Sequence, residues 1–416
     1  MAKAEMKVLH LVKTSYGARW AALQASILSQ LGIRVHVVIP SSKGDALVEW
    51  EKAGAQIHIA NVSLPVREPW RWPSVVKTIR ELVKEVSPDL IHSHFVTTTL
   101  SVRLALGRKH PIPRIFQVPG PLHLEHWPYR LLEIKTAGDN DYWIASSRYT
   151  QRLYARFGVP LERLFLSYYG FDVDRFLPTR SGSLRQKLGL PSECKIVGNM
   201  NYIYAPKYFL GQFTGLKAHE DIIEALSIVC RQRPDVMGVL IGGQWGGGDW
   251  YERYLRRHVR RSAGNRVIFV GRVQPQVVHQ YWPDFDCAVH VPISENCGGV
   301  VEPLLAGVPT IGGRVGGIPE VVFEGRTGWL VPPRKPRILA QRILEVLSQP
   351  GEARRRAMTG RHLVQVMFDL NRTAQEIKGI YHHIIDSAPR PAFFDSENVL
   401  NRIEREISSF AFQSMG

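Results

Sequence analysis

Glu295 and Glu302 flank a glycine pair, Gly298 and Gly299, and an apolar, helix-compatible run follows the glycines. Backbone amides at the start of a helix form an anion-binding site, and carboxylates accept hydrogen bonds from sugar hydroxyls. Phosphate and sugar recognised side by side predict a nucleotide-sugar site. The same predicted site includes three neighbouring residues: Asn296, Cys297 and Val300.

Two blocks of alternating strand and helix signals must position this site. The first block has this predicted order: a strand at 8–12, a helix at 20–31, a strand at 35–39, a helix at 74–86 and a strand at 88–94. The second block has a strand at 195–199, a helix at 218–231, and strands at 236–241, 266–270 and 286–291. Such alternation indicates parallel sheets with helices on both faces.

The fold class predicted from this order is α/β, with two Rossmann-like, doubly wound domains facing each other across a cleft. Their predicted extents are 1–178 and 179–388, with a hinge or linker at 181–183. A tail at 389–416 carries a helix-like stretch at 398–410. Two placements of this tail stay open: packing on the first domain, or a subunit contact in a homodimer.

Composition places the chain among ordinary globular proteins, with 416 residues, 44% hydrophobic and 22% charged. No apolar run approaches the roughly 20 residues of a membrane-spanning helix, and no secretory signal is recognised, so a cytoplasmic location is expected. The cysteines lack metal-ligand spacing and are expected to be reduced thiols: Cys194, Cys230, Cys287 and Cys297. No metal site is expected.

A net charge of +16 and a pI near 9.8 favour anionic partners. Three classes stay open: anionic small molecules, an acidic membrane surface at the inner face of the membrane, and nucleic acid, which is the least favoured. The densest basic run, 253–266, is interpreted as a solvated helix face.

A series of motifs resembles, in order, those of glycosyltransferase family 4, the retaining transferases of GT-B fold. The resemblance runs from about Lys7 to Ile385. The matching segments are Gly17-Ala18-Arg19, Pro88 to His94, Asp141-Tyr142 with Ile144 to Tyr149, Tyr169 to Asp172 with Arg175-Phe176, Gly215 to Asp221, Gly316 to Glu320, and Thr327 to Pro332.

The resemblance implies a retaining glycosyltransferase that moves a hexose-type sugar from a nucleoside diphosphate donor. UDP is favoured over GDP, and the acceptor is a hydroxyl of a glycan, a lipid-linked or a small molecule. It implies no cofactor and no bound metal, because protein charges stabilise the departing diphosphate.

Individual roles follow from the same resemblance. Lys217, just before a helix start, is expected to stabilise the leaving diphosphate. Glu295 is expected to accept hexose hydroxyls, and Glu302, in the first helical turn, ribose hydroxyls. His123 is expected to line the acceptor pocket or contact the donor hexose.

Backbone and base contacts complete the expected set. Gly298 and Gly299 would let the backbone approach the phosphates, the alternative being a turn that needs positive φ. Gly17, with Arg19, would close on the phosphates from the first domain. The base would be recognised near Arg272 and Val273.

Three departures from the family pattern stand out. Six residues separate the two glutamates, where the family has seven. Gln212 occupies the place of a family arginine, and Lys207, in the insertion-like stretch 201–213, is the candidate for the missing charge. His123, with His126 as the weaker alternative, replaces a family histidine.

Other function classes remain as alternatives. A GT-B scaffold or binding protein without turnover would explain the departures, and a sugar-nucleotide epimerase shares the architecture. A nucleic-acid binder would show steeply salt-dependent binding, and it is not expected.

Overall fold

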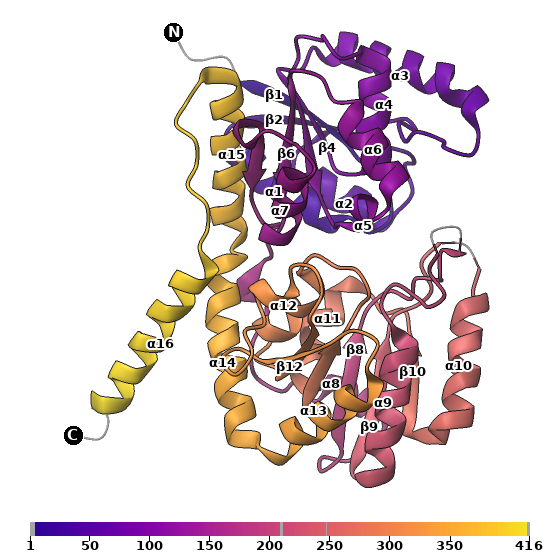
Figure 1. Cartoon of the computed structure of the whole chain (residues 1–416), viewed down its shortest axis with the longest axis vertical. Coiled ribbons are helices and arrows are strands. Elements are labelled where there is room, and N and C mark those ends of the chain that lie inside the picture. The colour runs from indigo at the N-terminus through magenta and orange to yellow at the C-terminus, as the bar shows by residue number, and fades with distance from the viewer. Residues whose placement is uncertain (1–4, 209–210, 247, 414–416) are drawn as a thin grey trace. The chain divides into compact units, whose positions relative to one another are not determined.

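The computed structural model describes residues 5–208, 211–246 and 248–413, and the chain divides into two compact units (Figure 1). Unit 1 contains the residues up to Asp172 and then Phe368–Phe394. Unit 2 contains Val173–Met367 and the residues from Asp395 onward. Each unit has its own parallel sheet and its own core.

Unit 1 is built on a seven-stranded parallel sheet of order β3-β2-β1-β4-β5-β6-β7. Its strands are β1 (Met6–Leu11), β2 (Ile33–Ile39), β3 (Gln56–Ile59), β4 (Leu90–Ser93), β5 (Arg114–Val118), β6 (Asp141–Ala145) and β7 (Leu164–Leu166). These strands are largely apolar because helices cover both faces of the sheet.

The helices of unit 1 bury apolar stripes on the sheet. α3, for example, has five buried apolar side chains at helical spacing: Val75, Ile79, Leu82, Val83 and Val86. The helices are α1 (Arg19–Gln30), α2 (Asp45–Lys52), α3 (Trp72–Val86), α4 (Val96–Leu106), α5 (Leu122–Glu125), α6 (Trp127–Lys135), α7 (Arg148–Arg156) and α15 (Leu370–Asp386).

Unit 2 repeats the plan with a six-stranded parallel sheet of order β10-β9-β8-β11-β12-β13. Its strands are β8 (Lys195–Met200), β9 (Val236–Ile241), β10 (Val267–Gly271), β11 (Cys287–His290), β12 (Thr310–Gly313) and β13 (Trp329–Val331). Its helices are α8 (Ser183–Leu188), α9 (His219–Gln232), α10 (Trp250–Ser262), α11 (Val278–Tyr281), α12 (Gly298–Leu305), α13 (Pro336–Ser348), α14 (Pro350–Met367) and α16 (Ser396–Gln413).

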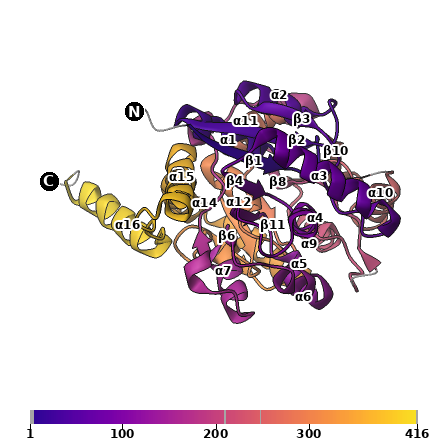
Figure 2. The same cartoon turned by 90° about the horizontal axis from the view of Figure 1, so that it is seen from above.

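The predicted α/β fold class and the predicted elements of both blocks are confirmed, but the domain boundaries differ. α15 was predicted in the second domain and instead packs against α1 in unit 1 (Figure 1 and Figure 2). Its apolar face, Ala374, Ile377 and Ile380, belongs to the core of unit 1.

The predicted hinge at 181–183 is also part of a unit rather than a linker. The Gly182 amide donates to Asp284 Oδ1 at 2.8 Å, and the Leu184 amide donates to Asp284 Oδ2 at 2.8 Å. Asp284 is fully buried, so it anchors this segment to unit 2.

The tail divides between the units. Residues up to Phe394 belong to unit 1, whereas α16 packs on α14 in unit 2, with Leu400 against Leu363 (Figure 1). Packing of the whole tail on the first domain is therefore not what the structure shows. Among the helices of the described residues, none is both long and apolar enough to cross a bilayer.

Candidate functional site

The strand order of unit 2 creates a switch point at its sheet. From β8 the chain proceeds outward to β9 and β10, and then returns to β11 on the other side of β8. Ligands of such sheets bind beyond the carboxyl ends of the strands at this point. Asn201 follows β8 there, and the loop after β11 leads through Glu295 into α12.

Glu295 is the centre of a buried polar cluster at this switch point. Its carboxylate forms an ion pair with Lys217, and both side chains are about one-seventh exposed. His290 Nε2 lies 3.2 Å from Glu295 Oε2, and Asn201 Nδ2 lies 3.2 Å from His290 Nδ1. Because the Asn201 amide donates to Nδ1, the proton on Nε2 can be donated to the carboxylate.

Electrostatics fix the protonation of this cluster. Burial would raise the pKa of Glu295, but Lys217 and His290 together hold that pKa below its ordinary value. Burial lowers the pKa of His290, although Glu295 opposes that shift. The cluster therefore holds an ionised carboxylate, a neutral imidazole and a lysine.

Hydrogen bonds to the Glu295 loop and to α10 hold the Lys217 loop in place. The Ile293 amide donates to the Leu216 carbonyl at 3.0 Å. The Gly215 amide donates to Tyr251 Oη at 2.7 Å. Ala218, the N-cap of α9, has φ 51°, a left-handed conformation that alanine rarely adopts.

The glycine pair begins α12 as predicted. Neither Gly298 nor Gly299 is left-handed, so the turn alternative is wrong. A Cβ at Gly299 would lie 2.1 Å from His290 Nε2, whereas one at Gly298 would meet nothing within 4 Å. Within the described ranges, the amides of both glycines donate to no other group. They are thus available to an anion.

Glu302 was predicted in the first turn of a helix, but it lies in the second turn of α12. The helix already begins at Gly298. Its Oε2 accepts a 3.1 Å hydrogen bond from the Trp282 indole. The indole orients the carboxylate.

The other three predicted residues of this stretch are buried: Asn296, Cys297 and Val300. The Asn296 amide donates to Glu295 Oε1 at 3.0 Å, and the Val300 amide donates to the Cys297 carbonyl at 3.3 Å. Burial raises the pKa of the Cys297 thiol well above its ordinary value. These buried side chains pack inside the protein and support the loop.

A line of aromatic rings joins Arg272 to this cluster. The Arg272 guanidinium lies 5.6 Å from the Tyr202 ring, and Trp245 lies 4.8 Å from Tyr202 and 6.2 Å from Tyr204. Lys217 Nζ lies 6.0 Å from the Tyr204 ring. Arg272 is exposed, and its neighbour in the predicted pair, Val273, is half-buried.

Lys207 and Gln212 belong to the inserted stretch, of which residues 209 and 210 lie outside the described residues. The Lys207 amide donates to Gln212 Oε1 at 3.3 Å. Burial lowers the pKa of the Lys207 ammonium. The expectation that Lys207 supplies the charge missing at Gln212 remains a prediction.

In unit 1, Gly17 lies in the loop between β1 and α1 with φ 66°. Its amide donates to Asp45 Oδ1 at 2.7 Å, and the Arg19 guanidinium pairs with Glu49 at 2.8 Å. Ala18 is left-handed with φ 54°, like Ala218 in unit 2. Each unit thus has a strained alanine just before the helix that follows its first strand.

His123 lies in α5, and its Nε2 is 2.9 Å from Tyr154 Oη. Burial lowers the pKa of His123 to about 3, so the ring is neutral. His126 is the N-cap of α6.

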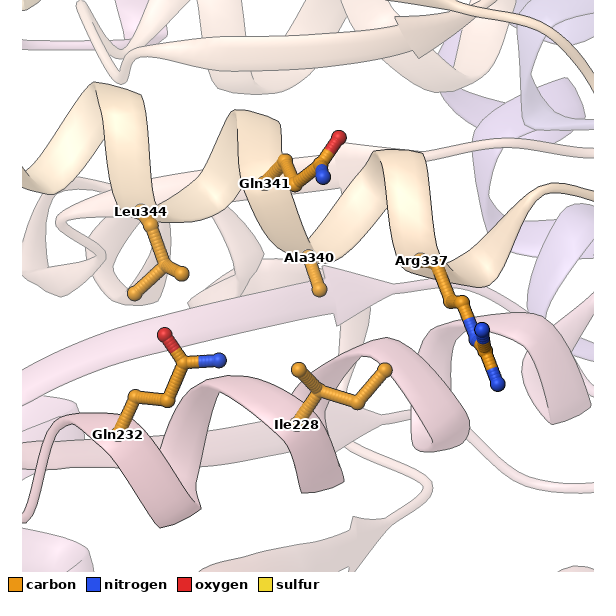
Figure 3. Close-up of a pocket in the computed structure, with 6 residues that line it drawn as sticks. All are labelled: Ile228, Gln232, Arg337, Ala340, Gln341 and Leu344. Atoms are coloured by element: carbon orange, nitrogen blue, oxygen red, sulfur yellow. The ribbon is translucent and has the colours of Figure 1, made fainter.

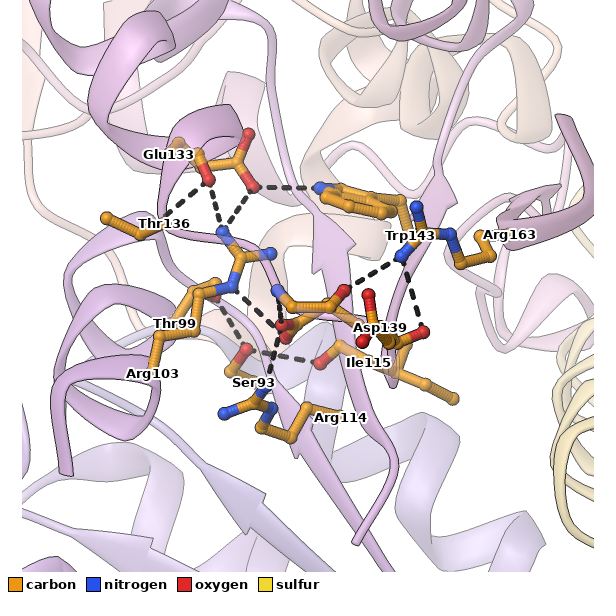
Figure 4. Close-up of polar contacts among 12 residues, drawn as sticks. Ser93, Thr99, Arg103, Arg114, Ile115, Glu133, Thr136, Asp139, Trp143 and Arg163 are labelled. Carbon is orange, nitrogen blue, oxygen red and sulfur yellow. Dashed lines mark hydrogen bonds and ion pairs between the residues drawn. The ribbon is translucent and has the colours of Figure 1, made fainter. Parts of the chain in front are cut away.

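A buried ionic network lies around Arg103 (Figure 4), and the charge of Arg103 also lowers the pKa of His123. Arg103 pairs with Glu133 and Asp141 at 3.1 Å each, and Arg114 pairs with Asp141 at 2.7 Å. The Trp143 indole donates to Glu133 at 2.8 Å. Asp141, from the Asp-Tyr motif, is therefore a structural residue.

A shallow groove of about 320 Å³ lies elsewhere in unit 2, between α9 and α13 (Figure 3). It is lined by Ile228, Gln232, Arg337, Ala340, Gln341 and Leu344. None of the predicted site residues lines this groove, so the groove is not part of the candidate site.

Nothing in the sequence pointed to His290, Asn201 or Tyr204 as site residues. His290 ends an apolar strand, where a single histidine gives no signal of its partner. Asn201 and Tyr204 fall in the inserted stretch. These residues lie near Glu295 only because β8 and β11 are paired neighbours in the sheet.

Comparison with known proteins gives two family matches. The model for "Glycosyl transferases group 1" matches residues 207–362, and that for "Glycosyltransferase Family 4" matches residues 18–175. Together these ranges cover most of the chain.

Individual relatives are distant. The spore coat protein SA of Bacillus subtilis is 27% identical over 56% of this chain and 62% of that protein. The D-inositol 3-phosphate glycosyltransferase of Arthrobacter sp. is 25% identical over 87% of this chain and 88% of that protein. The chain spans about half the length of several other curated relatives.

Solved structures share the fold. HepE of Anabaena, in complex with UDP and glucose, is 22% identical with a TM-score of 0.75, over 90% of this chain and 98% of that chain. Sucrose-phosphate synthase of Thermosynechococcus elongatus is 18% identical with a TM-score of 0.74, over 92% of this chain and 100% of that chain.

Proposed function

Because this chain belongs to the group 1 glycosyltransferases of glycosyltransferase family 4, with the GT-B fold, we propose that it transfers a hexose-type sugar, with retention, from a nucleoside diphosphate to an acceptor hydroxyl. The observation that carries this proposal is the Lys217–Glu295–His290 cluster beside the start of α12. It places a cation, an ionised carboxylate and two available amides at the switch point of one sheet.

The chemistry assigned to these groups is charge stabilisation. In the transfer, the bond from the anomeric carbon to the phosphate oxygen breaks and a bond to the acceptor oxygen forms. The acceptor's proton passes to the departing phosphate. Lys217 and the amides of Gly298 and Gly299 stabilise the charge that develops there, because fixed donors act strongly in a site that excludes water.

Glu295 binds the sugar in this proposal. Its ionised carboxylate accepts hydroxyl hydrogen bonds, and Lys217 turns from it toward the diphosphate when the donor binds. Glu302, oriented by Trp282, accepts the ribose hydroxyls. Arg272 and Val273, next to Tyr202, contact the base.

UDP is the proposed nucleotide and GDP the competing one. The support is the shared fold with HepE, which was solved with UDP and glucose. The proposed acceptor is a glycan, a lipid-linked or a small molecule. The net charge of +16 favours an anionic acceptor or one presented at an acidic membrane surface.

A panel of nucleotides and sugar nucleotides tests this proposal by thermal stabilisation. A ligand at 100 times its dissociation constant adds about 2.7 kcal/mol to the free energy of unfolding. UDP-sugars are expected to stabilise the wild type and to release UDP only with an acceptor. If a UDP-sugar stabilises the protein but no UDP is released with any acceptor, the chain is a binding protein. Epimerised donor without acceptor would indicate an epimerase. No stabilisation by any nucleotide would overturn the proposal.

A further inference from the structure

Three fully buried histidines meet in unit 1, outside the residues assigned above. His10 is in β1, His92 is in β4, and His94 directly follows β4. β1 and β4 are parallel neighbours with His10 opposite His92. One ring nitrogen from each residue can be chosen so that all three lie within 4.8 Å of one another.

The surrounding hydroxyls orient two of these rings. Tyr169 Oη donates to the Gln117 carbonyl at 3.2 Å, so its oxygen accepts from His94 Nδ1, also at 3.2 Å. This leaves a lone pair on His94 Nε2. Tyr381 Oη lies 2.6 Å from His92 Nδ1, and a hydroxyl that accepts there leaves a lone pair on His92 Nε2 as well. Outer hydrogen bonds of this kind are typical of imidazoles that bind metal ions.

Hydrogen bonding alone does not satisfy the cluster. His10 Nδ1 is 3.0 Å from His94 Nε2, but His10 Nε2 has no hydrogen-bond partner in the part of the chain that the structure describes. A buried polar atom without a partner costs about 1–3 kcal/mol. Burial lowers the pKa of His10 to about 3 and the pKa values of His92 and His94 well below their ordinary value. All three rings are therefore neutral near pH 7, the state that binds metals.

We propose that His10, His92 and His94 bind one divalent transition-metal ion, with Zn²⁺ as the expected ion and one nitrogen supplied by each ring. Neutral imidazoles without a thiolate suit Zn²⁺ better than Mg²⁺ or Ca²⁺, which prefer oxygen. Tetrahedral ligands at about 2.1 Å from the metal lie roughly 3.4 Å apart. The three candidate nitrogens lie within 4.8 Å of one another, so the rings have to move inward to reach that spacing.

The inferred role of this ion is structural. Through His92 and Tyr381, it would tie β1 and β4 to α15, the helix that returns to unit 1 after the chain has passed through unit 2. The site is independent of the donor chemistry proposed for unit 2.

Metal analysis of the full chain tests this inference. Protein expressed in minimal medium with Zn²⁺ is expected to retain about one equivalent after extensive dialysis. Protein refolded with Co²⁺ should show the intense visible absorption of tetrahedral cobalt. Tyr381→Phe should weaken metal affinity about 10–100-fold, because it removes only the outer hydrogen bond. A merely packed hydroxyl would leave the affinity unchanged.

His36→Gln is the matched control. His36 and His58 form a second stacked, hydrogen-bonded pair in the same unit, with ring nitrogens 3.2 Å apart. This variant should keep the metal, and His92→Gln should lose it. Wild-type protein that takes up neither Zn²⁺ nor Co²⁺ overturns the inference even if His92→Gln fails to fold. So does a folded His92→Gln that keeps its metal.

Discussion

Glu295 shows how one carboxylate can be both buried and ionised. Burial favours its protonated form, but Lys217 and the His290 ring stabilise the charge more strongly. Changing this carboxylate to an amide keeps its shape and removes the charge that holds Lys217 in place.

Glu295→Gln is predicted to weaken binding of the nucleotide-sugar donor roughly tenfold to a hundredfold. Losing a hydrogen bond to a charged group costs about 1.5–3 kcal/mol. Titration calorimetry with a UDP-sugar measures the change. Glu193→Gln, an exposed acid in the same unit, is the control and should bind as wild type does. Equal donor affinity in both variants would remove Glu295 from the site.

The two glycines predict different outcomes for the same substitution. Gly299→Ala should destabilise unit 2 by about 1–3 kcal/mol, because the added Cβ collides with the His290 ring, which Asn201 and Glu295 hold in place. Gly298→Ala should leave stability nearly unchanged, because the Cβ meets nothing. It should still weaken donor binding if a phosphate approaches this backbone. Urea unfolding and calorimetry separate the two effects, and equal stability losses would contradict the argument.

Residue types in sequence could indicate Glu295 and the glycine pair, because acids, glycines and a helix start carry a chemical pattern in one segment. Lys217, in a separate segment, was indicated by the family resemblance. His290 and Asn201 could not be found in this way. Their relation to Glu295 depends on β8 and β11 lying side by side, and no local pattern encodes which strands of a parallel sheet are neighbours.

At the scale of elements, hydrophobic periodicity was enough to predict most strands and helices. It does not predict which unit a helix packs in, as α15 shows. Its stripe of Ala374, Ile377 and Ile380 would suit the core of either unit, so the apolar period does not decide its domain. Only its contact with α1 decides the assignment to unit 1. A domain boundary placed at the Gly- and Ser-rich segment therefore did not reveal that Phe368–Phe394 returns to unit 1.

α16 yields a test of unit 2. Leu400 is fully buried against Leu363, and Arg326 pairs with Glu404 of the same helix. Leu400→Ala should lower the free energy of unfolding of unit 2 by about 2–5 kcal/mol, because it leaves a cavity. Arg402→Ala, more than half exposed on α16, should change it little. Denaturant unfolding measures both, and an unchanged midpoint for Leu400→Ala would show that α16 does not pack on α14.

At the scale of the whole molecule, the two units follow one plan. In each sheet the first strand is central, and its neighbour on one side comes from later in the chain. The Glu295 cluster of unit 2 lies where β8 meets β11, and His10 and His92 of unit 1 lie where β1 meets β4. Buried titratable groups thus lie at both switch points, which makes the protein sensitive to protons at both.

Acid should therefore destabilise the chain well above the range in which carboxylates titrate. Burial lowers the pKa values of His10, His123 and His219 to about 3 from 6.5. Between these values the unfolded state binds more protons, so stability is complete above pH 6.5 and falls as the pH drops toward 3. Each such histidine contributes a slope of up to about 1.4 kcal/mol per pH unit.

Urea midpoints between pH 7.5 and 5, measured with a chelator because a bound metal competes with protons, should fall steadily below pH 6.5. Each unfolding transition is followed separately, since the chain has two units. His219→Gln should reduce the slope for unit 2, because it removes one of the buried titrating rings. His362→Gln, at an exposed position, should not. A midpoint that stays constant down to pH 5 would mean that these rings gain protons without unfolding, which their complete burial should prevent.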